Sequence, residues 1–141
     1  MFVWKNELVN SLCESLVYPS LVGMTMGTPF AAWFFRLMGV KVGKNVYFET
    51  TEITEFDLVT IGDNTSLNHR CTIQTHLFED RVMKMSDLKI GNHCNLGSMS
   101  VVLYDSVMEN NSSISALSLV MKGEVIQQGT KWVGSPARFR E

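Results

Sequence analysis

Cysteine pairs, basic clusters and the basic residues that open a signal peptide are all missing from this sequence. The three cysteines, Cys13, Cys71 and Cys94, form no Cys-x-x-Cys pair and are odd in number, which argues against a disulfide framework and a structural zinc site. The formal net charge is -2 and lysine and arginine form no run, so nothing indicates nucleic-acid binding. Only Lys5 precedes Glu7, so the basic end of a signal peptide is absent. We therefore expect a cytoplasmic protein.

Charge is also absent between Glu14 and Arg36. That apolar run is long enough to raise the question of a transmembrane helix. Pro19 and Pro29 interrupt it, however, and serine and threonine residues dilute it. We predict instead an N-terminal segment, residues 1–39, of short helices that dock against the remaining domain. Contact of this segment with a membrane surface is the alternative that the sequence leaves open.

A repeat of six residues dominates the rest of the chain. Ten hexads open with an aliphatic residue: Ile61, Leu67, Ile73, Ile90, Leu96, Val102, Met108, Ile114, Val120 and Ile126. The fifth position of eight of these hexads is small, as in Cys71, Ser100 and Ser118. A helix needs apolar spacings of three and four, and hairpins of a sandwich need tight Asn-Gly turns, which do not occur. The pattern predicts an all-β fold, a parallel β-helix whose short strands turn a corner every six residues.

Several motifs carry a family resemblance. The segments "IGDNTS LNHRCT", "IGNHCN LGSMSV" and "WVGSPAR" resemble the hexapeptide-repeat acyltransferases over about residues 40–138. That resemblance implies a left-handed parallel β-helix with three hexads per coil, a homotrimer with sites in the grooves between subunits, and acyl-CoA as cosubstrate. The segments "TEFDLVTIGD", "QTHLFEDRVMK" and "VGSPAR" are similar to the C-terminal acyltransferase-like domains of nonribosomal peptide synthetases of the ε-poly-lysine synthetase type. This second resemblance implies a carrier protein with a phosphopantetheine thioester as the donor.

The repeat breaks once, between Ile73 and Ile90, which are seventeen positions apart. With three hexads per coil, residues 79–89 become a loop extruded between the second and third coils. In several branches of the resembled family, the catalytic histidine stands in a Thr-His segment where such a loop leaves the coil. Thr75 and His76 match that segment. A loop at this place can reach a neighbouring subunit and close a groove.

His76 is the residue that we predict to be the general base of acyl transfer, because the pKa of histidine lies near working pH. The coil layout places Asp105 next to it from the following coil, and Asp57 or Leu58 from the preceding one, depending on where the one extra residue of that coil falls. Either carboxylate could hold one ring nitrogen and leave the other free. Glu79 and Asp80, at the start of the loop, are the rival partners.

Acceptor contacts are predicted for His69, Asn68 and Glu79, near the expected subunit groove. His69 has a second interpretation, a pair across the subunit interface. His93 is expected to be a corner residue satisfied by the backbone.

Donor contacts are predicted for Ser100 and Ser118, which stack on successive coils, and for Lys122 and Arg138, by analogy with the basic C-terminal ends of the family. The alternatives are corner packing for the two serines and solvated surface charge for the two basic residues.

Three histidines on such a fold also suggest a comparison with the γ-type carbonic anhydrases, whose histidines hold zinc. The histidine spacings of seven and seventeen do not reproduce that pattern, so we expect no metal. The sequence therefore predicts an acyltransferase acting on an amine or hydroxyl acceptor. The alternative is a noncatalytic trimerising or docking domain of a peptide synthetase.

Overall fold

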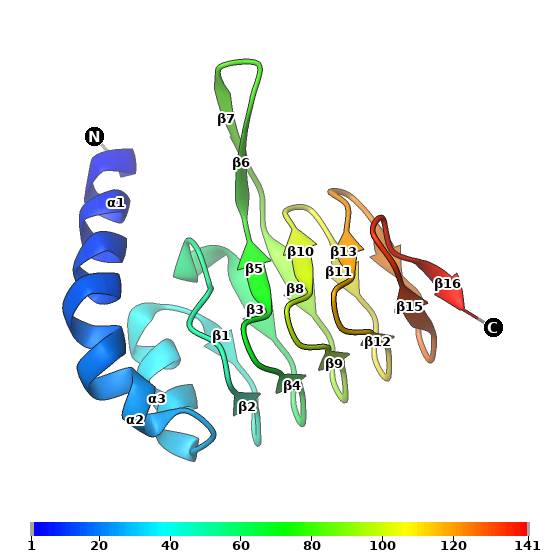
Figure 1. The fold of residues 1–141 in the computed structure, drawn as a ribbon, viewed down its shortest axis with the longest axis horizontal. Coiled ribbons are helices and arrows are strands. Elements are labelled where there is room, and N and C mark those ends of the chain that lie inside the picture. Colours follow the sequence, from blue (N-terminus) through cyan, green and yellow to red (C-terminus); the bar gives the residue numbers. More distant parts are fainter. Residues whose placement is uncertain (1, 141) are drawn as a thin grey trace.

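Stacked coils of short strands form most of the molecule, and helices precede them (Figure 1). The computed structural model describes residues 2–140. The helices are α1 (Phe2–Leu12), the π-helix η1 (Cys13–Val22), α2 (Gly23–Thr25), α3 (Pro29–Met38) and the 3₁₀-helix η2 (Phe56–Leu58). The strands are β1 (Lys41–Val42), β2 (Tyr47–Phe48), β3 (Val59–Ile61), β4 (Ser66–Leu67), β5 (Thr72–Gln74), β6 (His76–Glu79), β7 (Val82–Met85), β8 (Leu88–Ile90), β9 (Asn95–Leu96), β10 (Val101–Leu103), β11 (Val107–Met108), β12 (Ser113–Ile114), β13 (Leu119–Val120), β14 (Val125–Ile126), β15 (Lys131–Val133) and β16 (Arg138–Arg140).

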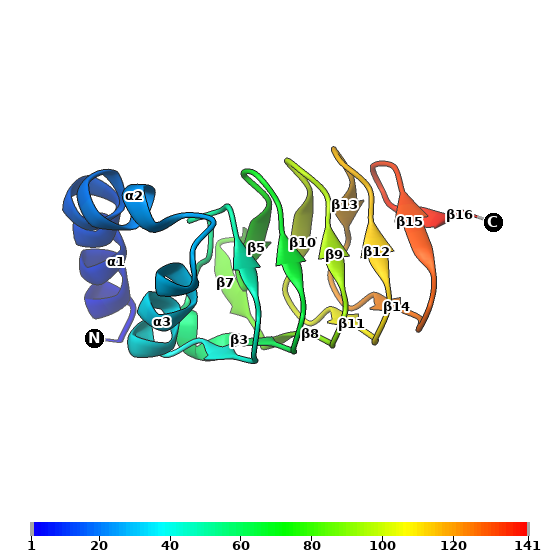
Figure 2. The same ribbon diagram turned by 90° about the horizontal axis from the view of Figure 1, so that it is seen from below.

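Three parallel sheets make the faces of the β-helix (Figure 2). Their strand orders are β1-β3-β8-β11-β14, β2-β4-β9-β12-β15 with β16 added antiparallel, and β5-β10-β13. Equivalent hexads lie in register: Ile61 pairs with Ile90, and Ile73 with Val102. All ten residues that open the hexads are at most 2% exposed, so they form the core. The parallel β-helix predicted from the repeat is confirmed.

The corners explain the recurring Ile-Gly-Asp/Asn motif. The backbone nitrogen of Lys44 donates to Asp63, that of Asp63 to Asn92, and that of Asn92 to Asn110, each at 2.7–2.8 Å. One short polar side chain per coil thus satisfies an amide of the coil before it. Glycine is needed beside it, because a Cβ at Gly62 would lie 2.3 Å from the Asn92 side-chain oxygen.

The N-terminal helices end at Met38, just before the first strand. Helix α3 covers the first coil with Ala31, Ala32 and Phe35, and the Phe35 ring stacks on Phe48 with centroids 4.7 Å apart. The opposite sides of the helices carry exposed apolar residues: Trp4, Leu8, Leu12, Leu16, Phe30, Trp33 and Leu37. No helix within residues 2–140 is both long and apolar enough to cross a membrane.

The break in the repeat is an antiparallel β-hairpin, which projects from the coils in Figure 1. Strands β6 and β7 pair from His76 opposite Met85 to Glu79 opposite Val82. The predicted bounds of 79–89 are wrong at both ends. The hairpin already starts at His76, and Leu88 is fully buried in β8, where it pairs with Val59.

Candidate active site

His76 lies where the chain leaves the second coil to enter the hairpin. Its Nδ1 is 2.7 Å from Oε2 of Glu55, a residue of the first coil. The His76 side chain is 15% exposed and that of Glu55 only 3%. When Nδ1 carries the proton and donates to the carboxylate, Nε2 keeps its lone pair. Nε2 makes no hydrogen bond to any residue within 2–140. In that tautomer the ring presents one nitrogen that can accept a proton from a substrate.

Thr75 completes the surroundings of the carboxylate. Its hydroxyl donates to the same oxygen, Oε2 of Glu55, and its backbone nitrogen donates to the Thr54 hydroxyl at 3.0 Å. A buried carboxylate needs such partners, because its desolvation is otherwise costly. Glu55 also has a left-handed backbone, with φ of 33°, which is unfavourable for a residue with a side chain. The local structure thus holds a buried carboxylate, carried on a strained backbone, against the histidine.

Asp57 and Asp105 do not hold His76, contrary to our prediction. The first coil is one residue shorter before Ile53 than the layout assumed, because Phe48 pairs with Leu67 but Ile53 bridges to Ile73. With this shift Glu55 lies in register with Thr75, and its side chain contacts the adjacent His76, while Asp57 is exposed on η2.

Asp105 fails for a different reason. The ladder between the second and third coils ends at Gln74 and Leu103, because the chain then turns into the hairpin. The segment that returns from the hairpin takes the predicted place of His76. The Asp105 backbone nitrogen donates to the Asp87 carbonyl at 3.2 Å, and the Asp105 carboxylate accepts from the Ser86 hydroxyl at 3.4 Å.

An ion-pair cluster ties the hairpin to the fourth coil. Lys122 Nζ lies 2.5 Å from Glu79 Oε2, and Lys84 Nζ lies 3.0 Å from the same oxygen. The hydrogen bond from Lys122, and to a smaller extent that from Lys84, holds the pKa of Glu79 below its usual value. The same contact with Glu79 raises the pKa of Lys122. The predicted acceptor residue and the predicted donor residue are therefore partners of each other.

The two serines predicted to contact the donor are buried. The Ser100 hydroxyl donates to the Gly97 carbonyl at 2.7 Å, and Ser118 accepts from the Gly134 nitrogen at 3.1 Å. Their side chains pack inside corners and do not line a groove. These contacts fit the corner interpretation, and the donor contact of the two serines stays a prediction.

The other predicted contact residues lie away from His76. Asn68 donates to the Asn95 side chain and to the Leu96 carbonyl, both at 2.7 Å. His69 is exposed at the same corner and lines a cavity of about 480 Å³. Arg138 is exposed on β16, at the C-terminal end of the β-helix.

His93 is a corner residue, as predicted, and its backbone nitrogen donates to Asp63 at 2.8 Å. Among residues 2–140, no group of three or more histidine, cysteine, aspartate or glutamate side chains is placed to hold a metal ion.

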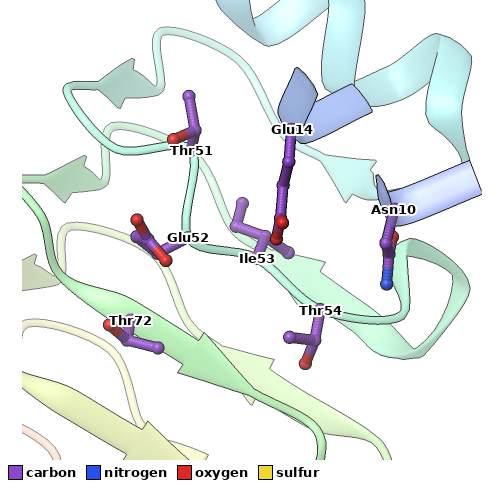
Figure 3. A pocket seen from close by; sticks show the side chains of 7 residues that line it. All are labelled: Asn10, Glu14, Thr51, Glu52, Ile53, Thr54 and Thr72. Carbon is purple, nitrogen blue, oxygen red and sulfur yellow. The ribbon is translucent and has the colours of Figure 1, made fainter. Parts of the chain in front are cut away.

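A cavity of about 220 Å³ adjoins the site between η1 and the first coil (Figure 3). Glu14 reaches into it from the helix, while Glu52 and Thr54 line it from the coil. The Thr54 hydroxyl lies 3.1 Å from that of Thr75, so this cavity reaches the groups that surround Glu55.

Comparisons with known proteins find one related protein and several solved structures with a similar fold. It is 44% identical over 137 residues to the Delta-poly-L-ornithine synthetase of Acinetobacter baumannii, a match that covers 97% of this chain but 10% of that protein. Among solved structures, a maltose O-acetyltransferase from Clostridium difficile superposes with a TM-score of 0.64 at 18% identity, covering 97% of this chain and 89% of that one. Soybean serine acetyltransferase in complex with serine superposes with a TM-score of 0.60 at 23% identity, covering 72% of this chain and 40% of that one. No family model matches. The chain has the fold of the hexapeptide-repeat acetyltransferases, and the resemblance predicted from its motifs is confirmed.

Proposed function

We propose that this chain transfers an acyl or aminoacyl group from a pantetheine thioester to an amine, with His76 as the general base. The contact of 2.7 Å between His76 Nδ1 and Glu55 Oε2 carries the proposal. It fixes the tautomer in which Nε2 can accept a proton, at the foot of a hairpin that leaves the coil.

The reaction needs one base and no covalent enzyme intermediate. The acceptor nitrogen attacks the thioester carbonyl carbon, and Nε2 of His76 takes the proton as the C–N bond forms. The tetrahedral intermediate then collapses, the C–S bond breaks, and the leaving sulfur receives the proton from His76. Glu55 stabilises the imidazolium that exists between these two transfers. General-base catalysis of this kind contributes roughly 10²- to 10⁴-fold to the rate.

The substrates follow from two lines of support. The acetyltransferase neighbours favour acyl transfer in general. The relative named for poly-L-ornithine favours an aminoacyl donor and an amine acceptor, although this chain matches only 10% of that protein. The donor is then coenzyme A or the phosphopantetheine arm of a carrier protein. Arg138 is an exposed candidate for contact with its phosphates.

We further propose a homotrimer. Val107 and Val125 are paired neighbours on the outer face of one sheet and are 36% and 50% exposed. Leu103, in contrast, is only 8% exposed and gives no such support. Burying the valines against a second copy would remove apolar surface from water.

A noncatalytic docking domain is the alternative function. The exposed apolar residues of the N-terminal helices, such as Trp4, Leu8, Phe30 and Trp33, favour it, because isolated domains rarely expose so many. A docking domain would not need the buried contact between Glu55 and His76.

A screen of donors and acceptors separates the two functions. Acetyl-CoA, ornithyl thioesters and loaded carrier proteins are tested with a panel of amines, and products are detected by mass spectrometry. Transfer that is lost in His76→Ala supports the proposal. Full activity of His76→Ala would reject the base, and the absence of transfer from every donor would favour docking.

A further inference from the structure

The two faces of the β6–β7 hairpin differ in chemistry. Residues directly opposite each other on antiparallel strands share a face, and successive residues alternate between faces. His76 pairs with Met85 and Phe78 with Met83, so these four side chains form one face. We call it the histidine face.

The opposite face binds the hairpin to the β-helix. It carries Glu79, which is paired with Lys122 of the fourth coil and with Lys84. Leu77 on this face is partly buried. The hairpin is therefore anchored through Glu79, while Phe78 and Met85 of the histidine face are exposed to solvent and Met83 is partly buried.

The histidine face is apolar around the His76 ring. The Phe78 ring meets the His76 ring edge to face, with centroids 5.9 Å apart, and is 64% exposed. Met85 is 42% exposed. A phenylalanine and two methionines around a histidine make a flexible apolar wall, and thioether side chains adapt to irregular shapes.

The role of His76 decides which substrate meets this wall. A general base contacts the nucleophilic atom of the acceptor, here the amine that Nε2 deprotonates. The carbon chain attached to that amine must then lie close to Phe78. We propose that the histidine face binds the methylene chain of an ω-aminoalkyl acceptor, with Phe78 as the main specificity-determining residue. This inference rests on the proposed function of His76.

Acceptor length is the first measurable consequence. Each methylene that enters the wall removes apolar area from water, so kcat/KM should rise about fourfold per methylene from ethylamine to pentylamine. Ethanolamine, which places a hydroxyl against the wall, should react more slowly than propylamine. Phe78→Ala should flatten this dependence, mainly through KM.

Val82→Ala is the matched control. The exposed fraction of Val82, 57%, is similar to the 64% of Phe78. Val82 lies on the same hairpin, but it pairs with Glu79 on the opposite face. It should leave the length dependence unchanged. A length dependence that survives Phe78→Ala, or that Val82→Ala removes equally, would overturn the proposal.

Binding without turnover keeps the test independent of the proposed reaction. In protein with ¹³C-labelled methionine methyl groups, pentylamine should shift the resonances of Met83 and Met85, in wild type and in His76→Ala alike, while ethanolamine should not. Full transfer activity of His76→Ala together with retained shifts would contradict only the proposed base. The absence of shifts at 50-fold excess over wild-type protein would reject the wall itself. Methionine resonances that shift with protein concentration, and do not change when pentylamine is added, would show that a second copy of the chain occupies the histidine face. That result would also reject the proposed acceptor site.

Discussion

Glu55 and His76, twenty-one positions apart in sequence, meet at 2.7 Å across the boundary between the first two coils. The Glu55 carboxylate is buried and the His76 ring is partly exposed, so only the histidine of this pair is accessible to a substrate. A negative charge held there stabilises a proton on the ring during catalysis.

Removing that charge should lower activity without unfolding the protein. We expect Glu55→Gln to reduce kcat by about 10²-fold or more, because the imidazolium loses its counter-charge. Asp57→Asn and Asp105→Asn are controls, since both carboxylates are exposed and neither contacts His76. Steady-state kinetics measures all three. Equal losses in Glu55→Gln and Asp57→Asn would contradict the assignment.

Thr75 should matter for stability as well as for the site. Its side chain is fully buried and donates to Glu55, so Thr75→Val leaves a buried carboxylate with one partner fewer. We expect a loss of about 1–3 kcal/mol in the free energy of unfolding, measured by urea denaturation. Thr72→Val, on the preceding strand and partly exposed, should change it by less than about 0.5 kcal/mol.

The ion pair between Glu79 and Lys122 should restrain the hairpin over a defined pH range. The pKa of Glu79 is lowered from 4.5, so its contribution is present above that value and is lost as pH falls through the lower, folded pKa. The pKa of Lys122 is raised from 10.5, so its contribution is complete below that value and is lost as pH rises through the higher, folded pKa.

Lys122→Met should therefore increase the nanosecond motion of Asp80 and Arg81 at pH 7, as measured by ¹⁵N relaxation. High salt should do the same in the wild type, because both groups are exposed to solvent. Lys89→Met, which removes a separate pair with Asp87, is the control. Unchanged order parameters in Lys122→Met would show that other contacts hold the hairpin.

The hexad openers should carry the stability of the coils. Ile114 is 1% exposed in the middle of the stack, and Ile114→Ala should cost about 2–5 kcal/mol through lost burial and the cavity that remains. Val125→Ala, half exposed on the outer face, should cost less than about 1 kcal/mol in the monomer. Urea denaturation distinguishes the two. A small effect of Ile114→Ala would mean that the coils repack.

Cys71 should resist alkylation in the native state. It is fully buried, and burial raises the pKa of its thiol to about 12, so almost no thiolate forms at pH 8. Iodoacetamide should modify Cys71 only after unfolding, as peptide mass spectrometry can follow. Rapid modification of the folded protein would indicate that the second coil opens locally.

The sequence predicted the coils well because their rule is local: one aliphatic residue in six must point inward, and Ile61, Ile90 and Met108 all do. Glu55 escaped prediction because register errors accumulate in the first coil, where no clear hexad precedes Ile53. A shift of one residue there exchanges one neighbour of His76 for another. The hairpin escaped because its strands follow a period of two inside a chain with a period of six.

The hairpin joins the second and third coils without entering their ladder, since Ile61 and Ile90 pair as if it were absent. Its tip can therefore change in length or composition while every coil keeps its neighbours. Selection could then retune what approaches His76 without redesigning the scaffold, and a hairpin grafted from a relative onto this stem should exchange acceptor preference as a single transplantable unit.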